Sequence, residues 1–186
     1  MPRLTNLSRS IKGCTALVTG AASGMGRATA HLFADEGANV AVLDRHEAGV
    51  SKVVDEISAV GGTARGWTHD LADHKKIAAV VDEIAHHFSG LNILVNNAGI
   101  DASARVQSKR YEEVWNQCFQ VNLEAHHYLI RAALPYLTAN KEGRIVNIAS
   151  TEGVGGSAFA SPYTAAKHGV IGLTRALAVE LAVQGV

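Results

Sequence analysis

Apolar and polar positions divide this chain into short and long segments that alternate. Apolar runs of strand length occur at Thr15–Thr19, Asn39–Leu43, Ala64–Thr68, Ile93–Val95 and Arg144–Ile148. Longer stretches with helical spacing of apolar residues lie at 24–36, 47–59, 73–88, 111–138 and 162–183. Regular alternation of strand and helix predicts an α/β fold in which helices cover both faces of a parallel sheet.

Glycine and proline mark the borders of these elements. Gly37, Gly61, Gly90 and Gly143 fall where a helix should stop, as C-terminal capping requires. Pro135 lies inside the fourth predicted helix and predicts a kink or an interruption there. Because no linker, low-complexity tract or repeat divides the 186 residues, we expect a single domain over 1–186.

The first predicted strand runs straight into a glycine-rich segment from Thr19 to Gly26, and a helix follows. Glycines let the backbone approach a pyrophosphate closely, and the free N–H groups of a helix N-terminus attract phosphates. A glycine cluster is also typical of a plain tight turn. Its position between the first strand and the first helix favours nucleotide binding.

Asp44 ends the second predicted strand. A carboxylate there can accept hydrogen bonds from an adenosine ribose and would repel a 2′-phosphate. Since Ser23 offers no cation to offset that repulsion, NAD is favoured over NADP. Arg45 points the other way, because it could swing toward a phosphate. Asp44 could also be a solvated acid at the strand end or a cap for the next helix.

Polar residues also follow the third and fourth strands, namely Asp70 and the segment Asn96–Gly99. Ligands of open parallel sheets bind outside the carboxyl ends of the strands, so a nucleotide should lie against these residues. Asp70 could equally cap the helix predicted to begin near Asp73.

Tyr163 and Lys167 stand four residues apart, which places them one turn apart on the same helix face. An ammonium group beside a phenol favours the phenolate, so such a pair can donate and accept a proton near neutral pH. The spacing also occurs by chance, and the pair gains its weight from the segments described above.

Charge and composition exclude several classes of function. With 17 basic and 17 acidic residues and no basic stripe, we expect neither nucleic acid nor an anionic membrane as partner. No apolar run reaches the roughly 20 residues of a membrane span, and the first ten residues lack the apolar core of a signal peptide. Cys14 and Cys118 match no ligand spacing, which favours a reducing compartment, the cytoplasm.

Three motifs together resemble the short-chain dehydrogenase/reductase family. They are T-G-x-x-x-G-x-G at 19–26, N-N-A-G at 96–99 and Y-x-x-x-K at 163–167, and the resemblance runs from about residue 12 to the end of the sequence. It implies a Rossmann-type doubly wound parallel sheet. The implied activity is hydride transfer between a nicotinamide cofactor, NAD rather than NADP, and a small-molecule secondary alcohol or ketone.

The resemblance also implies roles for individual residues. Tyr163 would exchange a proton with the substrate oxygen, and Lys167 would favour its phenolate and hold the nicotinamide ribose. Ser150 would hydrogen-bond the reacting oxygen, and Asn122 would hold a water that links Lys167 to solvent. By themselves, Asn122 is a polar helix residue and Ser150 a strand-end cap. The implied cofactor contacts are Gly20, Ser23, Gly24, Met25, Gly26, Asp44, Asp70, Leu71, Asn97, Ala98, Gly99, Tyr163 and Lys167.

The family pattern continues beyond the last residue of this sequence with a further strand, a loop at the nicotinamide and substrate-covering helices. We therefore expect a fold without the family's last strands, in which Arg144–Ile148 is an exposed edge. The alternative to an active enzyme is a catalytically inactive NAD-binding or interaction fragment. The family's long helices, here 111–138 and 162–183, commonly pack between subunits, which implies a homodimer or homotetramer.

Nine histidines invite a metal interpretation. His86-His87 and His126-His127 are adjacent pairs, and neighbours on a helix point about 100° apart rather than converging. No metal-ligand spacing accompanies them. We expect no metal, and solvated or interface histidines.

Overall fold

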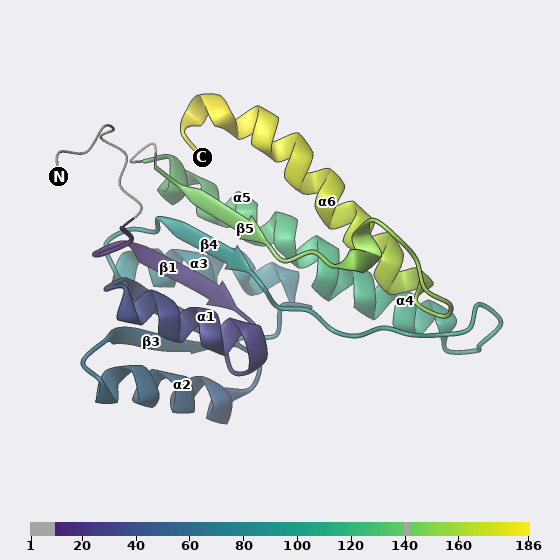
Figure 1. Cartoon of the computed structure of the whole chain (residues 1–186), viewed down its shortest axis with the longest axis horizontal. Helices are drawn as coiled ribbons and strands as arrows, with labels where there is room; N and C mark the ends of the chain where they lie inside the picture. Colours follow the sequence, from purple (N-terminus) through teal and green to yellow (C-terminus); the bar gives the residue numbers. More distant parts are fainter. Residues whose placement is uncertain (1–9, 140–141) are drawn as a thin grey trace, which may run out of the picture.

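The computed structural model describes residues 10–139 and 142–186. Within them, five parallel strands form one sheet in the order β3-β2-β1-β4-β5, with helices on both faces (Figure 1). This is the parallel sheet covered on both faces that the alternating pattern predicts, and the Rossmann-type arrangement that the family resemblance implies. The elements are β1 (Thr15–Thr19), α1 (Gly24–Asp35), β2 (Asn39–Asp44), α2 (Glu47–Ala59), β3 (Thr63–Thr68), α3 (His74–His87), β4 (Ile93–Asn96), α4 (Tyr111–Phe119), η1 (Gln120–Glu124), α5 (Ala125–Thr138), β5 (Arg144–Asn147), η2 (Thr151–Gly153), α6 (Ser161–Leu181) and η3 (Ala182–Gln184).

Alternate residues of the central strands face two separate apolar cores. On β1, Ala16 and Val18 pack with residues of α1 and α2, whereas Leu17 packs with residues of α3 and α5. Val40 and Val42 of β2 repeat the first of these contacts. All of these side chains are fully buried, as expected for strands covered on both faces. The two layers fix the carboxyl ends of the strands at one edge of the sheet.

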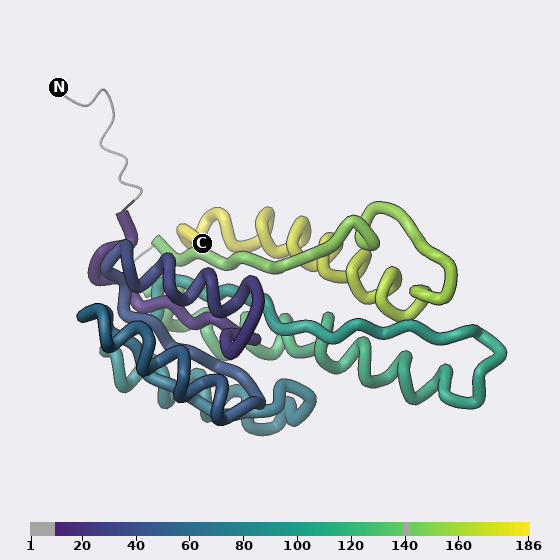
Figure 2. Tube along the Cα trace, turned by 60° about the horizontal axis from the view of Figure 1, so that its bottom comes forward, coloured from purple at the N-terminus to yellow at the C-terminus, as the bar shows by residue number. Residues whose placement is uncertain are grey.

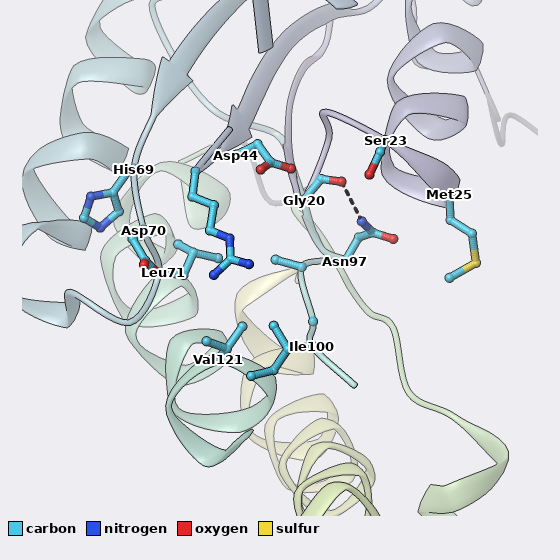
Figure 3. Close-up of a pocket in the computed structure, with 13 residues that line it drawn as sticks. Gly20, Ser23, Met25, Asp44, His69, Asp70, Leu71, Asn97, Ile100 and Val121 are labelled. Atoms are coloured by element: carbon cyan, nitrogen blue, oxygen red, sulfur yellow. Dashed lines mark hydrogen bonds between the residues drawn. The ribbon is translucent and has the colours of Figure 1, made fainter. Parts of the chain in front are cut away.

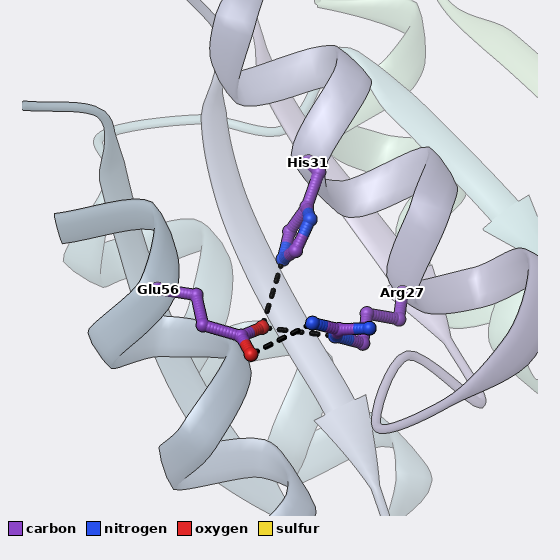
Figure 4. A network of polar contacts seen from close by, with 3 residues as sticks. All are labelled: Arg27, His31 and Glu56. Atoms are coloured by element: carbon purple, nitrogen blue, oxygen red, sulfur yellow. Dashed lines mark hydrogen bonds and ion pairs between the residues drawn. The ribbon is translucent and has the colours of Figure 1, made fainter. Parts of the chain in front are cut away.

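The layer of α1 and α2 carries a polar contact on its outside (Figure 4). Glu56 of α2 accepts two hydrogen bonds from Arg27 of α1, at 2.9 and 2.7 Å, and pairs with His31 of α1 at 3.1 Å. The Arg27 side chain is 41% exposed, so this network contributes little to stability and chiefly fixes how the two helices lie.

The predicted helix at 111–138 is real, but its interruption is in another place than expected. The chain stays helical through Pro135 to Thr138, and the change of winding is the π-helical segment η1, which contains Asn122. Pro135 has no N–H, so the carbonyl of Arg131 loses its normal partner without the helix ending. A π-helical turn inserts one residue per turn and often lies at a functional site.

The last strand, β5, lies at the edge of the sheet, as expected, and Val146 on it is 44% exposed. Helix α6 runs alongside β5 in both views (Figures 1 and 2), and the side chain of Asn147 donates to Thr174 at 2.9 Å. Beyond the strands, α6 and the α4–α5 run extend past the carboxyl ends of the sheet (Figure 1).

Within the described part of the chain, no helix is both long and apolar enough to cross a bilayer. The expectation about a signal peptide concerns the first ten residues, nine of which lie outside the described residues.

Candidate active site

A pocket of about 340 Å³ opens at the carboxyl ends of β1 to β4 (Figure 3). The strand order places β2 on one side of β1 and β4 on the other, so this is the point where successive connections diverge. Ligands of open α/β sheets bind at such a point. The lining residues are Gly20, Ser23, Met25, Asp44, Arg45, His69, Asp70, Leu71, Asn97, Ala98, Gly99, Ile100 and Val121.

Most of the predicted cofactor residues are in this lining, drawn together from four strand ends. Gly24, Gly26, Tyr163 and Lys167 are not. Gly26 has a packing reason instead, since a Cβ there would overlap the Gly20 carbonyl. His69 and Val121 also line the pocket but were not predicted, because they carry no motif and reach the pocket only through the fold.

The loops after β1 and β4 are joined by a fully buried threonine. Thr19 Oγ1 donates to the Val95 carbonyl at 3.2 Å and accepts the N–H groups of Asn97 and Ala98, both at 3.0 Å. The Asn97 side chain completes the link by donating to the carbonyls of Thr19 at 2.9 Å and Gly20 at 3.3 Å. The Asn97 amide nitrogen therefore holds the loop after β1 against the loop after β4 at the pocket wall (Figure 3).

Gly20 makes this close approach possible. Its φ of +63° lies in the left-handed region, and a Cβ added to it would lie 2.8 Å from the Ala98 Cα. Both the backbone conformation and the available space therefore require glycine where the loop after β1 meets the loop after β4.

Asp44 is held by backbone N–H groups on both carboxylate oxygens. Its Oδ2 accepts from Ala22 at 3.1 Å and its Oδ1 accepts from His46 at 3.0 Å. The cap of α2 is His46, whose Nδ1 accepts from Gly49 at 3.1 Å, so Asp44 does not cap that helix. It is a fixed acceptor at the pocket wall.

Asp70 also lines the pocket while making a local turn. Its Oδ1 accepts the Ala72 N–H at 3.0 Å, and Asp73, which makes no side-chain cap hydrogen bond, is the N-cap of α3. The capping alternative for Asp70 is therefore wrong.

The pair Tyr163 and Lys167 lies on α6, with Lys167 Nζ 5.6 Å from the centre of the Tyr163 ring. Lys167 is 3% exposed, and its Nζ donates to the Ile148 carbonyl at 2.7 Å. Burial lowers the pKa of Lys167 below its ordinary value, and the nearby Cys118 opposes that shift. The helix thus holds a buried ammonium beside a phenol, as the spacing predicts.

Asn122 occupies the π-helical segment η1 and is fully buried. Its Oδ1 accepts the Ile100 N–H at 2.8 Å, and its Nδ2 donates to the Ile100 carbonyl at 2.9 Å. Nδ2 also lies 3.2 Å from Cys118 Sγ, and burial raises the pKa of that thiol. Asn122 is therefore more than the polar helix residue that its sequence context suggests.

Ser150 is the N-cap of η2, and its Oγ accepts the Glu152 N–H at 3.2 Å. Because that bond uses a lone pair, the hydroxyl proton is left to donate to another oxygen. Glu152 in turn accepts from the N–H and the hydroxyl of Ser157, at 3.1 and 2.5 Å, and from Thr164 Oγ1. These hydrogen bonds, that of the Ser157 hydroxyl first, lower the pKa of Glu152 and hold the segment between Ser150 and α6.

The expectation that the histidines are solvated or at an interface is wrong for two of them. His126 is 2% exposed and His69 is 9% exposed, since both face inward from the sheet end and α5. Among the described residues, no group of three potential metal ligands gathers.

Comparisons with known proteins agree with this geometry. Residues 14–186 match a family model described as short chain dehydrogenase. Cyclohexanol dehydrogenase of Acinetobacter sp. is 39% identical over 97% of this chain and 72% of that protein. D-beta-hydroxybutyrate dehydrogenase of Rhizobium meliloti is 39% identical over 92% of this chain and 67% of that protein.

A solved structure from Beutenbergia cavernae, provisionally assigned as an NAD(P)-dependent gluconate 5-dehydrogenase, holds NADP at low occupancy. It superposes with a TM-score of 0.88 at 44% identity, covering 95% of this chain and 70% of that one. This chain therefore spans roughly 70% of the length of such relatives.

Proposed function

Because this chain belongs to the short-chain dehydrogenase family, we propose that it moves a hydride between NAD and a secondary alcohol or ketone, with Tyr163 as the acid and base. The observation that carries the proposal is the buried Lys167 ammonium beside the Tyr163 ring. A phenol beside a fixed ammonium can exchange a proton with a substrate oxygen.

The pocket residues fit a nicotinamide dinucleotide. Gly20 lets the loop after β1 lie against Ala98 at the pocket wall, and the N-terminus of α1 beside it attracts a pyrophosphate. The bound cofactor supplies the hydride donor or acceptor. Tyr163 gives a proton to the carbonyl oxygen in reduction and takes it from the alcohol in oxidation. The free hydroxyl proton of Ser150 donates to the same oxygen.

Lys167 and Asn122 act behind Tyr163 in this proposal. The bond from Lys167 Nζ to the Ile148 carbonyl fixes the ammonium in its position beside the Tyr163 ring. Asn122 braces the backbone of Ile100, next to the pocket, and belongs to the path by which Lys167 exchanges protons with solvent.

We propose NAD as the preferred cofactor on the evidence of Asp44. Both of its oxygens accept backbone N–H groups, which fix the carboxylate at the pocket wall, where it would repel a 2′-phosphate. Arg45 lines the same pocket, and a relative of known structure holds NADP, so NADP is the competing cofactor.

We further propose that the protein is a homo-oligomer in a reducing, cytoplasmic compartment. On α6, Val179 is 80% exposed, and Val183 in the following turn is 91% exposed, which leaves apolar surface for a second copy. Cys14 and Cys118 are both free thiols.

The test begins with fluorescence titration of NADH and NADPH, followed by NAD reduction at 340 nm with a panel of secondary alcohols. Tyr163→Phe should abolish turnover and leave NADH affinity unchanged, whereas Tyr111→Phe, on α4, is the matched control and should retain turnover. Equal turnover by Tyr163→Phe and the wild type would refute the assigned role. NADH binding without any turnover by the wild type would favour an inactive NAD-binding fragment.

A further inference from the structure

The two hydroxyl groups that the proposed reaction places on the substrate oxygen come from different elements. Ser150 caps the turn η2, whereas Tyr163 lies in the first turn of α6. The segment between them contains Gly153, Gly155 and Gly156, and glycine loses more conformational freedom on folding than any other residue. Contacts beyond local backbone preference are therefore needed to hold the two hydroxyls at a fixed distance.

Glu152 makes such contacts with both ends of the segment. Its Oε2 accepts the Ser157 N–H at 3.1 Å and the Thr164 hydroxyl, and its Oε1 accepts the Ser157 hydroxyl at 2.5 Å. Thr164 is the residue next to Tyr163, so the carboxylate binds the helical turn that carries the phenol. The Glu152 N–H donates to Ser150 Oγ at 3.2 Å. One residue thus contacts the serine hydroxyl with its backbone and the helix with its side chain.

A second contact between η2 and α6 lies one helical turn further along. Gly153 is buried, and a Cβ added to it would lie 2.9 Å from the Lys167 carbonyl oxygen. The turn therefore rests directly on the helix backbone at Lys167. Because Thr164 and Lys167 are three residues apart, they lie on the same face of α6. A turn held at two points of one helix face cannot swing about either of them.

Apolar packing does not hold this segment. Val154 is 75% exposed and Phe159 is 54% exposed. The backbone also bonds to the loop after β4, where the Ala104 N–H donates to the Phe159 carbonyl at 2.8 Å, but that bond does not involve α6. Hydrogen bonds to an ionised carboxylate are about twice as strong as those between neutral groups. The Glu152 carboxylate is therefore the main link between the segment and the helix.

We propose that Glu152 is a positioning residue, which fixes the Ser150 hydroxyl relative to the Tyr163 phenol at the substrate oxygen. This inference rests on the proposed dehydrogenase function. A misplacement of about 1 Å in such an arrangement can lower a rate about a hundredfold. Glu152 does not line the cofactor pocket, so the affinity for NADH should not depend on it.

The experiment measures kcat in the wild type and in protein that carries Ser150→Ala. Glu152→Gln removes one carboxylate oxygen and Thr164→Val removes the hydroxyl, each with little change of size. In the wild type, each should lower kcat about tenfold and leave the NADH dissociation constant unchanged. Together with Ser150→Ala, neither should lower kcat further, because no hydroxyl is left to position. Glu180→Gln, at an exposed position on α6, is the control and should leave kcat unchanged.

Amide hydrogen exchange provides a readout that does not depend on turnover. The Glu152 N–H is the donor to Ser150 Oγ, so its protection reports how well the serine hydroxyl is held. In Thr164→Val this amide should exchange faster than in the wild type, while the amides in the middle of α6 keep their protection.

An equal fold loss of kcat with and without the Ser150 hydroxyl would mean a merely structural role and would overturn the inference while leaving the proposed function intact. Unchanged exchange of the Glu152 amide in Thr164→Val would overturn it in the same way. A wild type that binds NADH without turnover would instead overturn the proposed function, and the inference with it. If Glu152→Gln does not fold, Thr164→Val carries both measurements.

Discussion

Asn122 contacts Ile100 as a neighbouring strand would, with its amide accepting the Ile100 N–H at 2.8 Å and donating to the Ile100 carbonyl at 2.9 Å. The side chain thereby replaces the backbone partners that an irregular segment lacks. It ties the chain leaving β4 to the π-helical turn η1, 22 residues further on.

Asn122→Ala should therefore lower the free energy of unfolding by about 1–3 kcal/mol, because both Ile100 groups lose their partner. Urea denaturation measures the change. Asn116→Ala, at an exposed position one and a half turns earlier on α4, is the matched control and should change stability little. An equal loss in both variants would contradict a specific role for the Ile100 contact.

Substitutions at Gly20 and Gly24 can distinguish the cost of a strained backbone from the cost of lacking space for a side chain. Both have positive φ, +63° and +54°, but only at Gly20 would a Cβ approach other atoms, with the Ala98 Cα 2.8 Å away. Gly24→Ala should cost about 1–2 kcal/mol of stability from the left-handed backbone alone. Gly20→Ala should cost more and should also weaken NADH binding. Equal unfolding free energies for the two variants would show that the Ala98 contact relaxes freely.

Glu152 should make stability depend on pH in acid. Hydrogen bonds from Ser157 and Thr164 lower its pKa in the folded protein. A carboxyl group whose folded pKa is depressed stabilises the fold above its unfolded pKa of about 4.3, and that contribution is lost as pH falls through the folded value. Glu152→Gln should thus melt below the wild type at pH 7, and the difference should shrink below about pH 4.

Melting curves of both proteins between pH 3 and pH 7 provide the measurement. Glu36→Gln, at an exposed position outside this network, is the control. A Glu152→Gln difference that stays constant over this range would mean that the carboxylate charge is not what holds the segment.

Asp44→Ala should shift cofactor selectivity toward NADP. Loss of the carboxylate removes the repulsion of a 2′-phosphate, so the ratio of the NADPH and NADH dissociation constants should fall about tenfold, or 1.4 kcal/mol. Fluorescence titration measures both constants. Arg45→Ala should move the ratio the opposite way, and the exposed Asp55→Ala should not move it. An unchanged ratio in Asp44→Ala would count against a ribose contact.

The fold was largely predictable because both of its signals are local. Strand segments such as Thr15–Thr19 are continuous apolar runs, and helix ends carry glycine, so hydrophobic pattern and capping agree. Pro135 shows the limit of such rules. Helix α5 continues through it because the flanking Leu129, Ala133 and Leu137 are buried, and this tertiary packing outweighs one missing hydrogen bond.

The positions of the candidate residues were predictable where a motif fixes a backbone requirement, as at Gly20, and where spacing fixes a helix face, as at Tyr163 and Lys167. It was not predictable where burial decides. A histidine such as His126 has the same local sequence signal whether it lies in solvent or in the core. Its burial depends on how α5 packs on β4, which no window of the sequence around it contains.

The hydrogen bonds of Thr19 to Asn97 and Ala98 join residues 78 and 79 positions apart in the chain. The β1–β2 hydrogen bonds connect near neighbours, whereas β4 must insert beside β1 across two intervening strand-helix units. Contacts between residues so far apart in the chain form slowly. The entropy of closing the long loop between them is lost before the contacts begin to stabilise the fold. Nucleotide binding should consequently appear late in refolding, after the recovery of helix content. The onset of binding would then report when β4 pairs with β1.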